Sequence, residues 1–198
     1  MSKKIVAITG GIGSGKSTLL KFLSTSGFTT VSCDKVYSDI IKTRSYKKKL
    51  KNLFPDCIKG KLLLKVDKKA LSEKVFNNKE SLGKLNALVH PLIMERALKI
   101  ASKGDTALAF IEVPLLFEGD FQNLFHHVIV VKRNLKDRID SVINRSKLSK
   151  QEVLNRVSNQ IDYETQDFTD YFVIENNGSE REFREKVSQV LKQIREEN

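Results

Sequence analysis

The sequence predicts an α/β fold in which helices cover both faces of a mainly parallel, five-stranded sheet. Five short apolar segments are spread along the 198 residues, and stretches of helical periodicity alternate with them. A glycine-rich segment joins the first apolar segment to the first helical stretch. Because parallel neighbours need a crossover connection, usually a helix, this alternation is typical of a parallel sheet.

The five short segments are interpreted as strands, and the third of them is a strongly apolar run. In chain order they comprise residues 5–9, 29–33, 107–113, 128–132 and 171–175. The first helix is expected at about 15–26, where Leu19, Leu20 and Leu23 recur at helical spacing.

Two helical inserts interrupt this core. More than seventy residues between the second and third strands have helix-like spacing without a clear strand pattern, and a connection of that length is a subdomain rather than a loop. Residues 134–169 form the second insert. Two capping boxes, at Ser149–Glu152 and Ser179–Glu182, mark the start of a helix in this insert and of the last helix. The core then comprises residues 1–34, 104–133 and 170–198.

The formal net charge of +11 is concentrated in one segment. Between Lys42 and Lys69 the sequence has eleven Lys or Arg and two acidic residues, a net charge of +9. Such a segment can bind a nucleic-acid backbone or steer small polyanions such as nucleotides. Only Tyr46 and Phe54 interleave with the basic residues, and no nucleic-acid recognition motif is present. We therefore expect small-molecule partners and no nucleic-acid partner.

Hydropathy and cysteine content narrow the class of protein further. No run approaches eighteen apolar residues, which excludes a membrane-spanning helix, and the N-terminal apolar run leads into glycines rather than a signal-peptide cleavage site. Cys33 and Cys57 lie 24 positions apart without a C-x-x-C pattern. A disulfide framework or zinc site is not expected, and the expected location is the reducing cytoplasm.

A glycine-rich motif follows the first strand. It reads Gly10-Gly11-Ile12-Gly13-Ser14-Gly15-Lys16-Ser17, which is the pattern G-x-x-x-x-G-K-[ST] between an expected strand and an expected helix. This context identifies a P-loop, whose backbone N–H groups and helix N-terminus bind phosphate oxygens. Lys16 can reach the β- and γ-phosphates, and the Ser17 hydroxyl can coordinate Mg²⁺. The motif predicts binding of a nucleoside triphosphate but names no reaction.

Two acidic residues follow strands at the edge of the sheet where ligands of open α/β folds bind. Asp34 comes directly after the second strand, where it can act as a general base for an acceptor hydroxyl or as a helix N-cap. Glu112, which precedes Val113 and Pro114, can organise Mg²⁺ or remain a solvated strand-end acid. The residues alone leave both alternatives open.

Four further residues have weaker signals. Arg138 and Arg145 are seven positions apart, so one helix can project both toward the same side. Closed over the P-loop they would neutralise charge on a transferred phosphoryl group, and the alternative is a solvated basic face. His90 has no adjacent nucleophile or metal set, and such a histidine is more often structural than catalytic. Pro91 is expected to bend or start a helix.

The whole chain resembles the dephospho-CoA kinase family, which completes coenzyme A synthesis. The P-loop contributes to the resemblance but is generic, whereas the Leu88–Pro91 and Pro114–Glu118 blocks make it specific. The matching positions occur in the family's order: the P-loop, Asp34, Leu85 to Pro91, Glu112 to Glu118, Arg138, Arg145, Arg156, Gln160 and Asp170 to Gly178.

The resemblance implies a three-layer P-loop kinase fold with a helical substrate-binding insert at 35–103 and a small lid at 134–169. It implies transfer of the ATP γ-phosphoryl group, with Mg²⁺, to the ribose 3′-hydroxyl of dephospho-CoA. The implied catalytic residues are Asp34, as the base, with Lys16, Arg138 and Arg145. The implied contacts to ATP are Gly11, Ile12, Gly13, Ser14, Gly15, Lys16, Ser17, Thr18 and Asn176. The implied contacts to dephospho-CoA are Asp34, His90, Pro114, Leu115 and Glu118. The implied ligands of Mg²⁺ are Ser17 and Glu112.

The sequence departs from the family at Ser32-Cys33-Asp34, where the family usually has two acids separated by one residue. Only the second acid is present, which puts in doubt any role of the first in holding Mg²⁺ or water. Near the end of the expected lid, Gln166 and Asp167 stand where basic residues are common. Two alternatives stay open: a P-loop kinase for another small molecule, and a nucleic-acid-binding or regulatory NTPase that only the charge favours.

Overall fold

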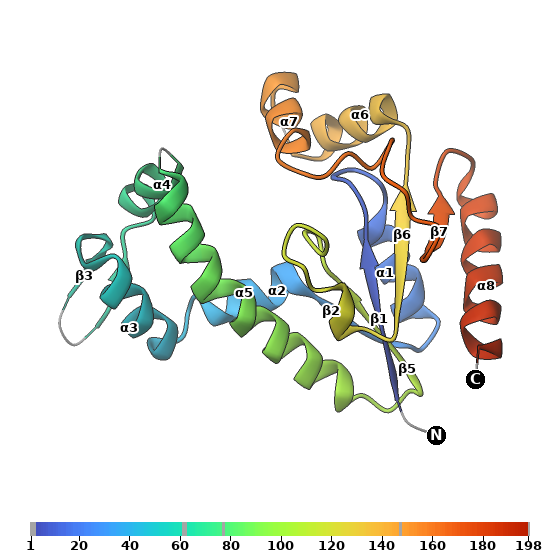
Figure 1. Cartoon of the computed structure of the whole chain (residues 1–198), viewed down its shortest axis with the longest axis horizontal. Helices are drawn as coiled ribbons and strands as arrows, with labels where there is room; N and C mark the ends of the chain where they lie inside the picture. Colours follow the sequence, from blue (N-terminus) through green and yellow to red (C-terminus); the bar gives the residue numbers. More distant parts are fainter. Residues whose placement is uncertain (1–2, 61–62, 77, 147, 198) are drawn as a thin grey trace. The chain divides into compact units, whose positions relative to one another are not determined.

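The computed structural model describes residues 3–60, 63–76, 78–146 and 148–197, so Lys61 of the basic segment lies outside the described residues. Five strands form one parallel sheet in the order β2-β5-β1-β6-β7 (Figure 1). The strands are β1 (Lys4–Thr9), β2 (Thr29–Ser32), β5 (Leu108–Glu112), β6 (His127–Lys132) and β7 (Phe172–Glu175). The predicted α/β class and parallel sheet are confirmed, and each observed strand end lies within one residue of the expected one.

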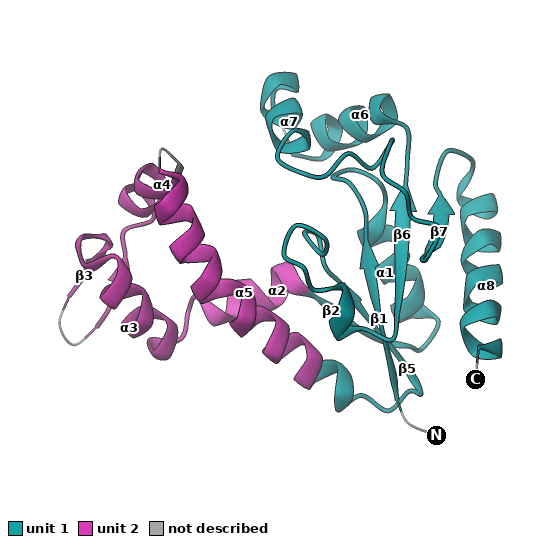
Figure 2. Cartoon of the chain, in the orientation of Figure 1, with its two compact units in different colours: residues 1–32, 100–198 teal, residues 33–99 magenta. Residues whose placement is uncertain are grey.

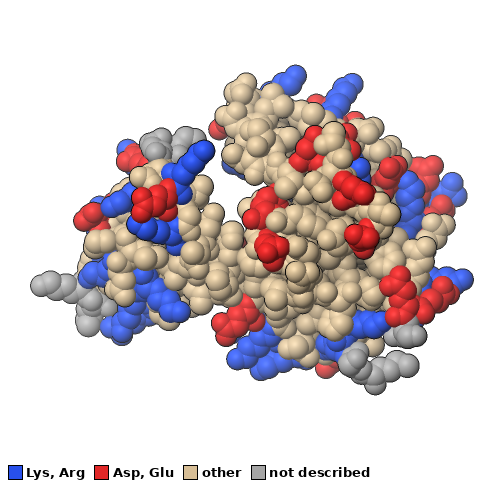
Figure 3. All heavy atoms as spheres, viewed as in Figure 1, with Lys and Arg blue, Asp and Glu red and all other residues tan. Residues whose placement is uncertain are grey.

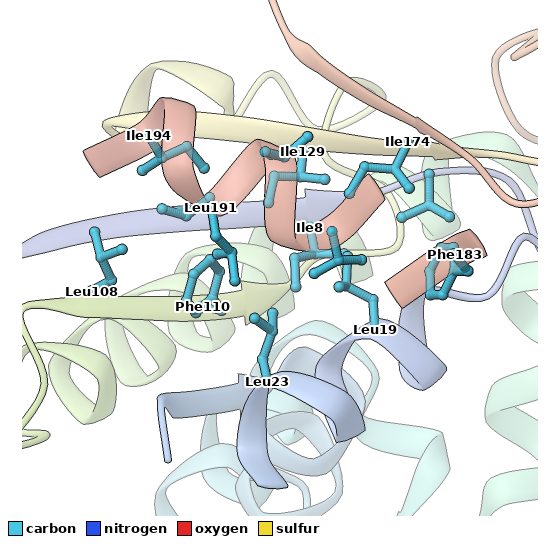
Figure 4. Close-up of a cluster of buried hydrophobic side chains, with 14 residues drawn as sticks. Ile8, Leu19, Leu23, Leu108, Phe110, Ile129, Ile174, Phe183, Leu191 and Ile194 are labelled. Atoms are coloured by element: carbon cyan, nitrogen blue, oxygen red, sulfur yellow. The ribbon is translucent and has the colours of Figure 1, made fainter. Parts of the chain in front are cut away.

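The three central strands, β5, β1 and β6, are largely buried on both faces, as strands of a parallel sheet between layers of other structure should be. Successive side chains of a strand point to opposite faces. Val6 and Ile8 belong to a hydrophobic cluster with residues of α1 (Lys16–Thr25) and α8 (Glu180–Glu196) (Figure 4). Ala7, between them, is fully buried as well. Because Leu23 of α1 is fully buried in this cluster, truncation to alanine should cost about 2–5 kcal/mol of stability.

The segment between β6 and β7 contains α6 (Leu135–Ser146) and α7 (Lys150–Val157). Both predicted capping boxes are confirmed, at the starts of α7 and α8. The Glu152 carboxylate accepts from Ser149 N at 2.8 Å, and the Ser149 hydroxyl accepts from Glu152 N at 3.3 Å. The short 3₁₀ helix η2 (Gln122–Leu124) lies between β5 and β6.

The chain divides into two compact units (Figure 2). We name residues 1–32 and 100–198 the P-loop unit, and residues 33–99 the basic unit. The expected lid, 134–169, falls within the P-loop unit. The basic unit contains α2 (Cys33–Ile40), α3 (Arg44–Leu53), the 3₁₀ helix η1 (Pro55–Cys57), α4 (Lys68–Phe76) and most of α5 (Lys79–Ser102).

The basic unit has a hydrophobic core of its own, to which Tyr46, Leu50 and Phe54 contribute. It also contains an antiparallel hairpin, β3 (Ile58–Lys59) and β4 (Lys65–Val66), where the sequence predicted helices. Strands of two residues are too short for alternation to be recognised in a sequence. Pro91 lies inside α5 rather than at its start, where its missing N–H removes one bond from the helix ladder.

Nearly all of the net charge belongs to the basic unit. Its residues include 17 Lys or Arg and 7 Asp or Glu, a net charge of +10, which leaves +1 for the rest of the chain. Figure 3 shows Lys and Arg side chains gathered over the α3 region of this unit. Lys59 pairs with Asp67 at 2.7 Å, but no ion pair among the described residues involves Lys47, Lys48 or Lys49.

Candidate functional site

The P-loop connects the carboxyl end of β1 to α1, and its glycines fit closely against neighbouring segments. Gly15 directly precedes α1 with a φ of 107°, and Gly13 has a φ of 79°. Residues with a Cβ rarely adopt these angles. A Cβ on Gly15 would also collide with the Asn176 side chain, and one on Gly13 with the backbone of Arg138. The backbone conformation and the close contacts with Asn176 and Arg138 therefore both favour glycine at these two positions.

Lys16 and Ser14 place buried polar groups in this loop. Lys16 is 8% exposed, and its ammonium donates to the carbonyls of Gly10 at 2.7 Å and Gly11 at 2.9 Å. The Ser14 hydroxyl is buried and has no hydrogen-bond partner in the described structure. A buried hydroxyl without a hydrogen-bond partner is energetically costly, and a phosphate oxygen can accept a hydrogen bond from it. The chemistry of these two groups fits a polyphosphate.

Ser17 and Glu112, the two residues expected to organise Mg²⁺, lie in contact. The Ser17 hydroxyl donates to Glu112 Oε1 at 2.8 Å. Glu112 ends β5, is 6% exposed and is in register with Ile8 of β1. A hydroxyl has one proton and two lone pairs, so donation to Glu112 leaves lone pairs of Ser17 for another partner.

Ser17 and Glu112 fit a magnesium ion that is bound together with the phosphates of a nucleotide. Mg²⁺ prefers oxygen ligands, keeps several waters and is usually bound by few protein groups together with phosphates. Ser17 and Glu112 supply such oxygens beside the P-loop. Within the described part of the chain, no group of three or more His, Cys, Asp or Glu could hold a metal ion by itself.

Arg138 of α6 lies against the P-loop and is 3% exposed. Its Nε donates to the Ile12 carbonyl at 3.0 Å, and its guanidinium would collide with a Cβ on Gly11. Burial lowers the pKa of Arg138, and Glu164, at 3.8 Å, opposes that shift. An arginine remains protonated at physiological pH, so a poorly solvated positive charge is fixed beside the loop.

The two arginines expected to act together have different environments. Arg145 is in the last turn of α6, is exposed and lines a surface depression of about 480 Å³ with Asp137 and Asp140. Seven residues of helix separate the two arginines by about 10 Å along the axis. The structure brings Arg138 to the P-loop and leaves Arg145 exposed to solvent.

Two amide side chains hold the P-loop backbone. Asn176, expected to bind ATP, donates from Nδ2 to the Ser14 carbonyl at 2.8 Å. Gln160 Oε1 accepts from Ile12 N at 2.7 Å, across 148 positions of sequence. The sequence had indicated no role for Gln160 apart from its place in the family resemblance. Its presence among the positions that match the family was the one signal in the sequence that pointed to Gln160.

The block after β5 also contacts the segment that follows α7. The exposed Glu118 accepts through Oε1 from Ile161 N at 3.0 Å. Pro114 is half-buried, and Leu115 is 40% exposed next to the buried Leu116. Glu118, expected to contact the acceptor, therefore also has a partner within the P-loop unit.

Tyr163 fixes the same segment to the end of β1. Its hydroxyl lies 3.3 Å from Thr9 Oγ1, and its ring stacks on Phe168 with 5.6 Å between centroids. Burial raises the pKa of Tyr163 to about 12. The hydroxyl therefore stays protonated near neutral pH, which suits a structural hydrogen bond and not a catalytic base.

Two of the expected acceptor residues, Asp34 and His90, belong to the basic unit. Asp34 is exposed and is the second residue of α2, whereas Ser32 is the last residue of β2 and is in register with Glu112. His90 is half-buried in α5. Burial lowers the pKa of His90, so its imidazole is neutral at pH 7.

The two cysteines are buried and unbridged, as the sequence indicated. Burial raises the pKa of the Cys57 thiol, which suits an unreactive core residue. Among the helices of the described residues, none combines the length and apolar character needed to cross a membrane.

Known proteins resemble this chain over almost its whole length. A family model described as dephospho-CoA kinase matches residues 4–182. A dephospho-CoA kinase of Thermus thermophilus is 34% identical over 190 residues, which cover 96% of this chain and 91% of the relative. The crystal structure of TT1252 from Thermus thermophilus superposes with a TM-score of 0.83 at 32% identity and covers 98% of both chains. A solved structure of the dephospho-CoA kinase from Campylobacter jejuni has a TM-score of 0.68 at 32% identity and covers 97% of both chains.

Proposed function

The chain belongs to the dephospho-CoA kinase family, and from that premise we propose that it transfers the γ-phosphoryl group of ATP to the ribose 3′-hydroxyl of dephospho-CoA, giving coenzyme A and ADP. One observation carries the proposal: the family match spans residues 4–182 and therefore includes the basic unit and the blocks around His90 and Pro114, not the P-loop alone. The two buried, unbridged cysteines are in keeping with a cytoplasmic location.

On the donor side, we assign the β- and γ-phosphates of ATP to the P-loop. Lys16 supplies a positive charge, and the buried Ser14 hydroxyl supplies a donor that has no other partner in the described structure. Ser17 would hold Mg²⁺ through an oxygen lone pair, while Glu112 accepts a hydrogen bond from the Ser17 hydroxyl. The bound ion would neutralise charge on the β- and γ-phosphate oxygens.

On the acceptor side, we assign the general base to Asp34. The 3′-oxygen forms a bond to the γ-phosphorus, the bond to the β–γ bridging oxygen breaks, and the hydroxyl proton moves to the Asp34 carboxylate. The support is its position in the chain: Asp34 follows β2 by two residues, and ligands of open α/β sheets bind beyond the carboxyl ends of the strands. Ser32 stands at the position of the family's usual first acid, which leaves Asp34 as the acid of this segment.

The remaining expected residues are assigned supporting roles. Arg138, buried against the P-loop, would stabilise charge that develops on the transferred group. Arg145, exposed, would assist only in a rearranged lid. His90, Pro114 and Leu115 would line the site for dephospho-CoA, as the family resemblance implies.

The test is a panel of acceptors. With MgATP, we expect dephospho-CoA to give a far higher kcat/KM for ADP release than nucleoside monophosphates, adenosine or shikimate. Phosphorus NMR of the product should place the new phosphate on the 3′-oxygen. A higher kcat/KM with a nucleoside monophosphate would overturn the acceptor assignment, and hydrolysis stimulated by polynucleotides would favour the nucleic-acid-dependent alternative.

A further inference from the structure

The peptide groups on either side of Ile12 are held by two side chains. The Ile12 N–H is bound by Gln160 Oε1 at 2.7 Å, and its carbonyl accepts from Arg138 Nε at 3.0 Å. Both partners come from the segment between β6 and β7, more than a hundred positions away in sequence. Because Gly11 and Gly13 flank Ile12, the local backbone has little preference of its own. These two contacts hold both peptide groups of Ile12, in addition to the bonds that Lys16 makes to the carbonyls of Gly10 and Gly11.

The backbone next to Gln160 is in turn held by the block that follows β5. The next residue, Ile161, donates its N–H to Glu118 Oε1 at 3.0 Å. Two residues further on, the buried Tyr163 anchors the same segment beside Thr9. A continuous set of contacts thus runs from Glu118 through Ile161 and Gln160 to Ile12. Glu118 lies six residues after Glu112, so this set joins the metal-organising strand to the P-loop by a second route.

We propose that Gln160 is a positioning residue that sets the P-loop for the β- and γ-phosphates, and that Glu118 acts on ATP binding by holding Gln160 in place. The inference rests on the proposed function for its reaction but not for its first measurement, which is nucleotide binding. It also gives Glu118 a role different from contact with the acceptor: loss of Glu118 should weaken binding of the donor.

We expect these contacts to affect ATP affinity because a loop that is not held in one conformation must be ordered when the nucleotide binds, and this ordering costs entropy. A P-loop binds phosphate with several N–H groups at once, and each must point inward before the ligand arrives. Without Gln160, the Ile12 peptide loses its acceptor and the flanking glycines allow other orientations. Binding of ATP or ADP must then supply the ordering entropy, which weakens affinity without altering the chemistry of the acceptor.

The first experiment replaces Gln160 by Met, which has similar length and no strong acceptor. Gln160→Met should raise the Kd of both ATP and ADP by about 2–10-fold, the range expected for one hydrogen bond to a backbone amide. The Kd of dephospho-CoA should not change, and any fall in the thermal unfolding midpoint should be no larger than the loss of one hydrogen bond explains. The matched control is Gln166→Met, an exposed glutamine of the same segment, which should leave ATP binding as in the wild type. Equal ATP affinity in Gln160→Met and wild type would overturn the proposal.

The second experiment separates the two roles of Glu118 through a pair of variants. Glu118→Gln keeps an oxygen acceptor for Ile161 N–H, whereas Glu118→Met does not. Glu118→Met should raise the KM for ATP about as much as Gln160→Met does, with kcat little changed, and Glu118→Gln should restore the wild-type value. The double variant Glu118→Met/Gln160→Met should bind ATP no more weakly than either single variant, because both break the same set of contacts.

Three results would contradict the role assigned to Glu118. The first is a rise in the KM for dephospho-CoA alone. The second is an equal loss of activity in Glu118→Gln and Glu118→Met. The third is a double variant in which the losses of ATP affinity add. The first two would instead indicate a carboxylate that contacts the acceptor. Should dephospho-CoA prove not to be the acceptor, the ATP and ADP affinities still test the positioning role, so the two hypotheses can fail separately.

Discussion

The P-loop unit and the basic unit handle charge in opposite ways. The P-loop unit has a net charge of +1, but Lys16 and Arg138 are buried and each donates to carbonyls of the P-loop. The basic unit has a net charge of +10, and Lys48 and Lys49 on α3 are exposed. The P-loop unit nearly balances its positive and negative residues and holds two cations in fixed positions against the P-loop. The basic unit has a large excess of positive residues, some of which are exposed to solvent.

This difference predicts which step of the reaction each unit controls. Charges held in a poorly solvated site act strongly on a neighbouring phosphoryl group, because little solvent screens them. Exposed lysines interact weakly with any single partner but raise the encounter rate with an anionic ligand. Substitutions in the P-loop unit should therefore act on turnover and nucleotide binding, and those on α3 on substrate capture.

The largest effect is expected for Lys16→Ala. Removal of the cation that reaches the β- and γ-phosphates should lower kcat by about 10²–10³-fold, as loss of one transition-state donor typically does. The Kd of dephospho-CoA should remain close to that of the wild type. Steady-state kinetics, with circular dichroism to confirm folding, measure both. Lys21→Ala, an exposed lysine of the same helix, is the control. Near-normal turnover in Lys16→Ala would place the phosphates elsewhere.

Asp34→Asn is the substitution best able to break the comparison, because Asp34 belongs to the basic unit yet is proposed to act in the chemical step. Asparagine resembles aspartate in shape but does not accept the hydroxyl proton. We expect kcat to fall by at least about a hundredfold, within the range of positioned proton transfer. ATP affinity should be unchanged, and stability should remain within about 1 kcal/mol, the scale of a helix-terminus effect.

The control for Asp34 is Asp39→Asn, an exposed acid of the same helix paired with Lys42. Its kcat should match that of the wild type. If Asp34→Asn turns over within about threefold of the wild type, well below the general-base range, the base is another group. The division between a chemical unit and a capture unit would then be sharper than proposed.

Glu112→Gln tests the metal side of the P-loop unit. The glutamine side-chain oxygen can still accept the hydrogen bond from the Ser17 hydroxyl, but it carries no negative charge. The Mg²⁺ concentration for half-maximal activity should rise by about 10–100-fold, the usual effect of removing a group that orients a metal ligand. Glu175→Gln is the control, because Glu175 also ends a parallel strand but is exposed. An unchanged Mg²⁺ requirement in Glu112→Gln would mean that another group organises the ion.

The features that the sequence predicted correctly are those with a local cause. The P-loop was recognised because an apolar strand precedes the glycines and an apolar helix follows them within a few residues. The capping box at Ser149 and Glu152 likewise depends on groups three residues apart. Patterns of this kind are complete within a short window, so one sequence is enough to find them.

The features that sequence analysis missed depend on the folded chain. Gln160 contacts Ile12 across 148 positions, and Glu118 contacts Ile161 across 43. No spacing rule connects such residues, because the intervening elements decide where each side chain lies. Arg138 and Arg145 show the same limit, since a shared helical face does not determine how far along the helix the P-loop reaches. The hairpin of β3 and β4 was missed because its strands are only two residues long.

The smallest effect is expected from neutralising Lys47, Lys48 and Lys49 together by Gln, and it tests the basic unit directly. No ion pair of these lysines occurs in the described structure, so their replacement should leave the fold intact. If α3 guides dephospho-CoA by long-range attraction, the triple variant should have a KM for dephospho-CoA about 2–5-fold higher than the wild type at low ionic strength, with kcat unchanged. The difference should vanish near 1 M salt, where the screening length is only about 3 Å. Neutralising Arg181, Lys186 and Lys192 of α8 is the control for net charge alone and should leave that KM unaltered. A tenfold fall in kcat in the α3 variant would show that these lysines act on the chemical step, and the distinction between the two units would no longer hold.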